Sequence, residues 1–160
     1  MQMFPGSENC GPKSELQFKT LRSSGANFEA TVLGANGSVP AIEAAAAAWA
    51  GKNIIPPDLF DAELGYFIDR YYAGGVSTAH FPHLNFRPND HQALVENVLK
   101  RDANDPQSVA AALLIITFRY RNNLFHGLKW AYRLQDQLEN FLCANSVMPK
   151  SIDLDRASKP

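Results

Sequence analysis

A six-residue segment in the last third of the chain combines side chains that suit chemistry on a phosphodiester. Residues 121–126 read RNNLFH and follow a strongly apolar stretch. An arginine is a permanent cation whose planar fork of donors matches phosphate oxygens, and a histidine exchanges a proton near neutral pH. Arg121 and His126 are therefore the candidate catalytic pair, because phosphodiester cleavage needs a cation at the developing charge and a proton carrier close by.

Basic side chains surround this segment, although the whole chain is nearly neutral. The net charge is -1 and the isoelectric point is about 6.4, which does not indicate a protein that coats nucleic acid. No acidic residue occurs between Asp105 and Asp136, whereas Arg119, Lys129 and Arg133 fall within that interval. These three are candidate substrate-binding residues that contact phosphates. The other reading is that they form a solvated basic face.

The N-terminal part is expected to be a peripheral arm. The first 40 residues are rich in Gly, Ser, Asn and Pro, and only residues 27–33 alternate in a way that predicts a short extended strand. Residues 41–50 are dominated by alanine, which favours a helix, and Trp49 is expected to anchor that helix by packing.

Two amphipathic helices are predicted before the motif. Pro56-Pro57 suits the first turn of one helix, and Gly74-Gly75 is expected to end it. Asn89 or Asp90 is expected to cap the second helix, which should end near Asp102.

A buried helix is predicted next. Asp105 is expected at its N-cap and Pro106 at its first position, and residues 109–118 are apolar on almost every side. Because asparagine competes for backbone hydrogen bonds, Asn122 and Asn123 are expected to bend or end this helix. The motif is thus expected in a turn, before an amphipathic helix that should end near Cys143.

This order of elements predicts an all-α protein, a bundle of four or five helices. We expect an N-terminal arm with the Ala-rich helix over residues 1–55, the bundle over 56–145 and a loose C-terminal tail over 146–160. Cys10 and Cys143 lack the spacing of a zinc site or a disulfide framework. No apolar run reaches the roughly 20 residues that span a bilayer, so a cytoplasmic protein without a membrane partner is expected.

Residues 121–126 and their context resemble the HEPN superfamily, the higher eukaryotes and prokaryotes nucleotide-binding domain. Its signature is an arginine, four to six further residues and a histidine, usually with a polar residue directly after the arginine. Here the gap is four residues and the polar residue is Asn122. The family places this motif beside the last long helix of a small helical bundle, and residues 56–143 offer the same order. The resemblance therefore implies a HEPN-like four- to five-helix bundle.

Catalytic HEPN proteins are metal-independent ribonucleases in which two motifs usually meet across a dimer. The resemblance implies that Arg121 stabilises charge on the phosphate and that His126 serves as general acid or base for attack by the 2′-hydroxyl. Asn122 would orient the histidine or the phosphate. The resemblance implies RNA or a nucleotide as partner, a homodimer, no metal and no cofactor. It is compatible with an antitoxin partner in a defence or toxin-antitoxin setting. The alternative is a non-catalytic HEPN module that binds a nucleotide, RNA or a protein.

Three further features carry weaker hypotheses. Some toxin members of the family have a tyrosine two residues after the histidine, and a partner enzyme modifies it. This chain has Leu128 at that position. Asp69-Arg70 is expected to be a surface ion-pair element, or else a polar pair that faces the motif. His80 and His83 have a spacing that metal ligands can show, but no cysteine or paired carboxylate accompanies them, so no metal site is expected.

Overall fold

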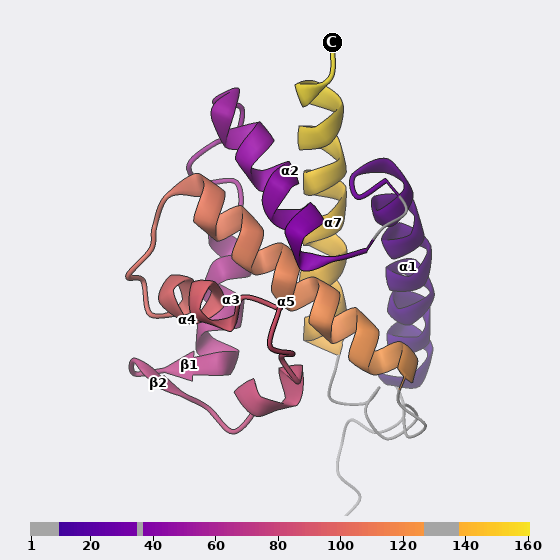
Figure 1. The fold of residues 1–160 in the computed structure, drawn as a ribbon. Coiled ribbons are helices and arrows are strands. Elements are labelled where there is room, and N and C mark those ends of the chain that lie inside the picture. Colours follow the sequence, from indigo (N-terminus) through magenta and orange to yellow (C-terminus); the bar gives the residue numbers. More distant parts are fainter. Residues whose placement is uncertain (1–9, 35–36, 127–137) are drawn as a thin grey trace, which may run out of the picture.

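The computed structural model describes residues 10–34, 37–126 and 138–160. In chain order its elements are α1 (Cys10–Thr31), α2 (Val39–Gly51), α3 (Asp61–Tyr71), β1 (Tyr72–Ala73), β2 (Val76–Ser77), the 3-10 helix η1 (Phe81–Leu84), α4 (Gln92–Leu99), α5 (Pro106–His126) and α7 (Leu138–Ser158) (Figure 1). The two short strands pair antiparallel in a small hairpin. The protein is an all-α helical bundle, and this prediction from the sequence is confirmed.

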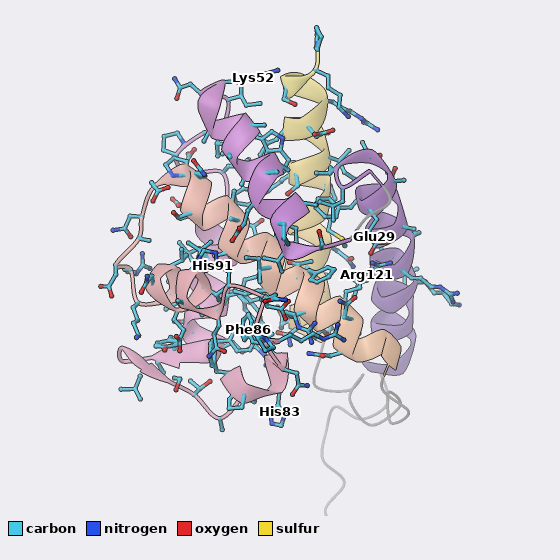
Figure 2. The ribbon with its side chains drawn as sticks, in the orientation of Figure 1. Glu29, Lys52, His83, Phe86, His91 and Arg121 are labelled. Atoms are coloured by element: carbon cyan, nitrogen blue, oxygen red, sulfur yellow. The ribbon has the colours of Figure 1, made fainter. Side chains whose placement is uncertain are left out.

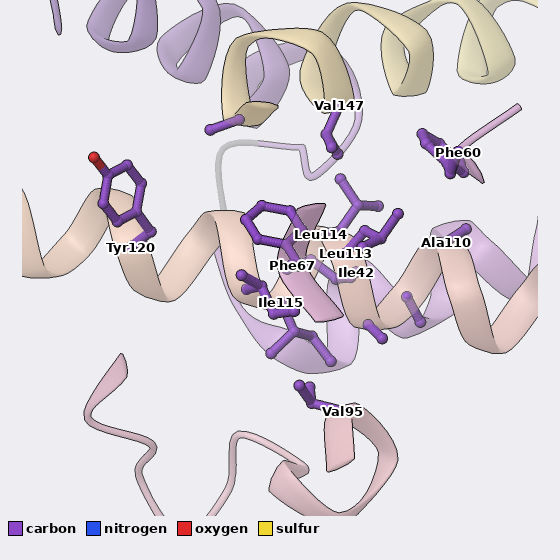
Figure 3. Packing of buried hydrophobic residues seen from close by; sticks show 14 of the residues in the cluster. Ile42, Phe60, Phe67, Val95, Ala110, Leu113, Leu114, Ile115, Tyr120 and Val147 are labelled. Carbon is purple, nitrogen blue, oxygen red and sulfur yellow. The ribbon is translucent and has the colours of Figure 1, made fainter. Parts of the chain in front are cut away.

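Helix α5 lies at the centre of the bundle (Figure 1). Residues 110–116 are all at most 3% exposed, and seven consecutive residues cover every side of a helix with 3.6 residues per turn. Around it pack Ile42 of α2, Phe67 of α3, Val95 of α4 and Val147 of α7 (Figure 3). The predicted buried helix is confirmed.

The start of α5 follows its sequence signal. A side-chain oxygen of Asp105 accepts a hydrogen bond from the backbone N–H of Ser108 at 2.9 Å, and Pro106 is the first helical residue. This bond satisfies one of the N–H groups that a helix leaves without an intrahelical partner. The predicted N-cap is confirmed.

The predicted cap of α4 is wrong. The helix begins at Gln92, and its N-cap is His91, whose backbone is left-handed with φ 56°. Asp90 instead accepts the backbone N–H of Arg87 at 2.7 Å and lies 3.4 Å from Nε of Arg119. The Asp90 carboxylate therefore binds the loop before α4 and Arg119 of α5, and it does not cap α4.

The hairpin explains where α3 ends. Gly74 and Gly75 have φ of 62° and 78°, a backbone conformation that residues with a side chain rarely adopt. They form the turn between the two short strands, directly after α3. The helix ends at Tyr71, before β1, so the predicted end at Gly74-Gly75 is a few residues too late, and the helix begins at Asp61, a few residues after the predicted start at Pro56-Pro57.

The N-terminal residues do not form a peripheral arm where the structure describes them. Residues 27–31 belong to α1, so the extended strand predicted there is wrong. Leu21 and Phe28, seven residues apart on one helix face, are buried in the same apolar core as the predicted anchor Trp49 of α2. Helix α1 lies beside α7 (Figure 1), and this packing outweighs the polar composition of the segment.

The C-terminal residues likewise belong to the bundle. Helix α7 continues to Ser158 and contains Pro149, whereas the sequence predicts an end near Cys143 and a loose tail after it. A proline inside a helix removes one hydrogen bond and costs about 3 kcal/mol. Here Ile152 and Leu154 are buried beyond it, and their packing offsets that cost. None of the helices in the described part of the chain combines the length and apolar character needed to cross a bilayer.

Candidate functional site

The motif begins within a helix, not in a turn. Helix α5 runs without interruption through Asn122 and Asn123 to His126. The side-chain amide of Asn123 donates to the carbonyl oxygens of His83 and Leu84, both at 3.0 Å, instead of competing for the backbone of its own helix. The bend predicted at the two asparagines is wrong for this reason.

Arg121 faces the N-terminal helix. Its Nη1 pairs with Oε1 of Glu29 on α1, and Figure 2 shows the two labelled side chains together between α1 and α5. The side chains are 14% and 33% exposed, so the pair is mostly withdrawn from water. The Glu29 carboxylate thus accepts from the guanidinium of Arg121 within the folded chain.

Gly25 makes the approach of Arg121 to α1 possible. A Cβ added to Gly25 would lie 2.7 Å from Cζ and 2.8 Å from Cδ of Arg121, closer than real Cβ atoms come to any neighbour. Only a glycine therefore lets α1 pack against the Arg121 side chain as it lies here. Sequence reasoning missed Gly25 and Glu29, because their relevance depends on a contact between segments about 90 residues apart.

Arg119 is a structural residue in this fold. It is 3% exposed; its Nε donates to the carbonyl of Leu84 at 3.2 Å and its Nη2 to the carbonyl of Asn85 at 2.8 Å. Burial lowers the pKa of Arg119 below its usual value, while nearby Asp90 acts in the opposite direction. Its guanidinium holds the end of η1 against α5.

The other candidate residues are only partly described. Asn122 is half-buried on α5, on the turn that also carries Arg121. His126 is the last residue of α5, and its side chain lies outside what the structure describes. Lys129 and Arg133 lie in residues 127–137, which are also outside it.

The helical register relates Arg121 to His126. Five residues along an α-helix correspond to about 7.5 Å of rise and about 140° of rotation. The two positions are therefore on different faces of α5, although they are close together along the helix axis. One straight helix does not present both positions on a common face to a single phosphate.

Three histidines, at positions 80, 83 and 91, precede α5, and Asp69-Arg70 lies in α3. His80 and His83 are exposed on and beside η1, and His91 pairs with Glu43 of α2. Among the described residues, no group of three or more His, Cys, Asp or Glu side chains is placed to hold a metal ion. Arg70 lines a pocket that is described below.

The comparisons with known proteins do not extend these observations. No family model, no curated protein and no solved structure matches this chain.

Proposed function

We propose that this protein is a HEPN-type endoribonuclease that cleaves RNA without a metal ion, at a site formed by two copies of the chain. The observation that carries the proposal is the register of Arg121 and His126 on one helix. Because these positions are about 140° apart on α5, a site that uses both is built more directly from Arg121 of one copy and His126 of a second. This arrangement agrees with the dimer that the sequence resemblance implies.

Each residue has a defined task in this proposal. Arg121 contributes a two-donor fork to the charge that develops on the phosphate. His126 exchanges the proton with the 2′-hydroxyl or with the leaving oxygen. RNA is the substrate because only RNA carries the 2′-hydroxyl that attacks the phosphate. Asn122, one position after Arg121, orients the phosphate or the histidine.

The ion pair with Glu29 sets a condition on this activity. A phosphate that binds Arg121 has to compete with the Glu29 carboxylate for the guanidinium. A phosphate can take the place of the carboxylate, because both are oxyanions that accept hydrogen bonds from the same guanidinium fork. Glu29 therefore competes with the substrate for Arg121.

The test is RNA cleavage by the full chain in the presence of EDTA. Wild type is compared with Arg121→Ala, Arg121→Lys and His126→Ala, and the ends of the fragments are analysed. Loss of a general acid or base should lower cleavage by roughly 10²- to 10⁴-fold, and the products of the wild type should end in 2′,3′-cyclic phosphate. The lysine variant should not recover full activity, because an ammonium lacks the planar fork. Equal cleavage by all four proteins would indicate a contaminating nuclease and would overturn the proposal.

A non-catalytic binding module is the second candidate, and one observation favours it. Arg121 is 14% exposed and pairs with Glu29 inside the monomer, so the arginine also has a structural task. In this case the folded chain binds RNA, a nucleotide or a protein without turnover. RNA binding without cleavage, unchanged by His126→Ala, would favour this module over the enzyme. A partner antitoxin and a cytoplasmic location remain predictions from the sequence.

A further inference from the structure

An open pocket lies between α3 and the segment before η1, and its lining does not include Arg121. It has a volume of about 520 Å³ and is lined by Tyr66, Asp69 and Arg70 of α3 and by Thr78, Ala79 and His80 of the segment before η1. A volume of this order lies within the range of small-molecule sites. The pocket is separate from the Arg121 pair, which faces α1.

Arg70 is the cation of this pocket, and its charge has no close counter-ion in the described part of the chain. No carboxylate oxygen among those residues lies within 4.0 Å of its nitrogens. Its Nε is buried, again without a hydrogen-bond acceptor among the residues that the structure places. Arg119 and Arg121 differ in this respect, because carbonyl groups and Asp90 surround the first and Glu29 pairs with the second.

Two tyrosines lie close to Arg70. Its Cζ lies 5.9 Å from the ring centroid of Tyr71. Burial raises the pKa of Tyr66 above its usual value and the pKa of Tyr71 to about 12, so both phenols are neutral near pH 7. The hydroxyl of Tyr66 donates to Asn140 of α7 and is already engaged. The half-buried guanidinium therefore has neutral phenol groups as hydrogen-bond partners. The exposed carboxylate of Asp69 lines the same pocket but is not within 4.0 Å of the Arg70 nitrogens.

The opposite wall of the pocket is held in place by hydrogen bonds. The Thr78 hydroxyl donates to the carbonyl oxygen of Arg70 and accepts the backbone N–H of His80 at 3.3 Å. These bonds tie the segment that follows the hairpin to the end of α3. The exposed imidazole of His80 lines the pocket and retains a side-chain donor for a ligand.

We propose that this pocket binds a small phosphomonoester through Arg70 and His80. A phosphate monoester carries nearly two negative charges and three acceptor oxygens, so it compensates Arg70 better than a single carboxylate does. The volume exceeds that of a free phosphate, and Tyr66 and Ala79 offer an apolar surface for the organic part of the ligand. The proposal does not depend on the ribonuclease activity, because Arg121 and Asn122, the motif residues of the proposed site whose side chains the structure describes, do not line the pocket.

The experiment titrates the ¹⁵N-labelled full chain with phenyl phosphate, followed by the amide signals of Ala79 and His80. Inorganic phosphate, benzoate and phenol are titrated as separate arms. Phenyl phosphate should bind more tightly than each of them, because only it combines the dianion with an aromatic body. Tighter binding of inorganic phosphate would assign the site to the free anion, and equal binding of phenol would remove the role of charge. Either result would overturn the phosphomonoester proposal.

Variants locate the binding at Arg70. Arg70→Gln should weaken phenyl phosphate by about tenfold or more, whereas Arg156→Gln, on the exposed face of α7, should leave the affinity unchanged. If circular dichroism shows that Arg70→Gln is unfolded, Arg70→Lys decides, and its loss of the planar fork should weaken binding by about threefold or more. A folded Arg70 variant with the affinity of the wild type would refute the site, as would the absence of wild-type binding at 10 mM phenyl phosphate, roughly the weakest affinity of interest.

Discussion

Gly25 of α1 lies directly against the guanidinium of Arg121 on α5. No residue with a Cβ fits at position 25 while the Arg121 side chain stays where it is. A Cβ at Gly25 would be 2.7 Å from Cζ of Arg121. A glycine inside a helix costs roughly 1 kcal/mol relative to alanine, and α1 accepts this cost at a buried position. The contact joins the N-terminal helix to the motif, and several of the expected outcomes below follow from it.

Gly25→Ala should destabilise the protein, although alanine is the better helix former. The added methyl group displaces the Arg121 side chain, and such overpacking costs about 1–3 kcal/mol. Gly65→Ala is the matched control, because Gly65 lies inside α3 and a Cβ there meets no atom within 4 Å. The control should stabilise the protein by up to about 1 kcal/mol. Urea denaturation measures both changes, and an equal gain in stability for the two variants would contradict the contact.

Glu29→Gln should lower the stability of the protein and raise its RNA cleavage. Removal of the carboxylate leaves Arg121 partly buried without this counter-ion, and a partly screened pair of this kind is worth about 1–2 kcal/mol. If Arg121 contacts phosphate, the loss of its internal competitor should raise cleavage at low RNA concentration by a lower KM. Urea denaturation and initial rates give the two values. A variant that is less stable and also no better at binding RNA would assign Arg121 to the fold alone.

Local signals in the sequence predicted the elements whose ends depend on neighbouring residues. Asp105-Pro106 at the start of α5 and Gly74-Gly75 after α3 act within a few residues, so their effect is visible in the sequence. The fully apolar run 109–116 likewise indicates burial, and the start signal Asp105-Pro106 before it favours a helix over a strand.

The failures depend on contacts between distant segments. Helix α1 is polar in composition and becomes stable through Leu21 and Phe28 against the core, which no local pattern reveals. The same holds for Asn123, whose side chain reaches the carbonyls of η1. At the site, residue types identified Arg121 from the sequence, but its partner Glu29 could not be identified because it lies on a helix that the sequence did not predict.

Arg119→Met should lower stability without a specific effect on RNA binding. The variant leaves the carbonyls of Leu84 and Asn85 and the carboxylate of Asp90 without this donor, and hydrogen bonds to a charged group contribute about 1.5–3 kcal/mol. Arg156→Met is the surface control, with an expected change within about 0.5 kcal/mol. Thermal denaturation measures stability. A folded Arg119 variant with normal stability and impaired RNA affinity would return this residue to the substrate-binding set.

Asp105→Asn should alter how stability depends on pH. Hydrogen bonding to the backbone N–H of Ser108 lowers the pKa of Asp105 below its usual value, more than desolvation raises it. The charged carboxylate thus stabilises the fold above the unfolded-state pKa of about 3.8, and this contribution is lost as pH falls through the lower folded-state value. Asparagine retains the cap without titrating. The stability difference between wild type and variant should therefore shrink on acidification; denaturation series at pH 7 and at about pH 3 test this.

Mixing two inactive variants tests whether the proposed ribonuclease site spans two copies. A heterodimer of Arg121→Ala with His126→Ala contains one composite site in which both residues are mutated and one in which both are intact. After random exchange of subunits, half of the dimers are mixed and each has one of two sites, so about a quarter of wild-type cleavage should return. The variants are unfolded together, refolded as a mixture and assayed in EDTA beside each variant alone. A site within one chain predicts no recovery, because every chain then lacks either the arginine or the histidine.

Light scattering on the same samples distinguishes this result from a failure to associate. A dimer without recovered activity rejects the composite site. A monomer at tens of micromolar, roughly the range of a weak dimer, rejects the dimer itself.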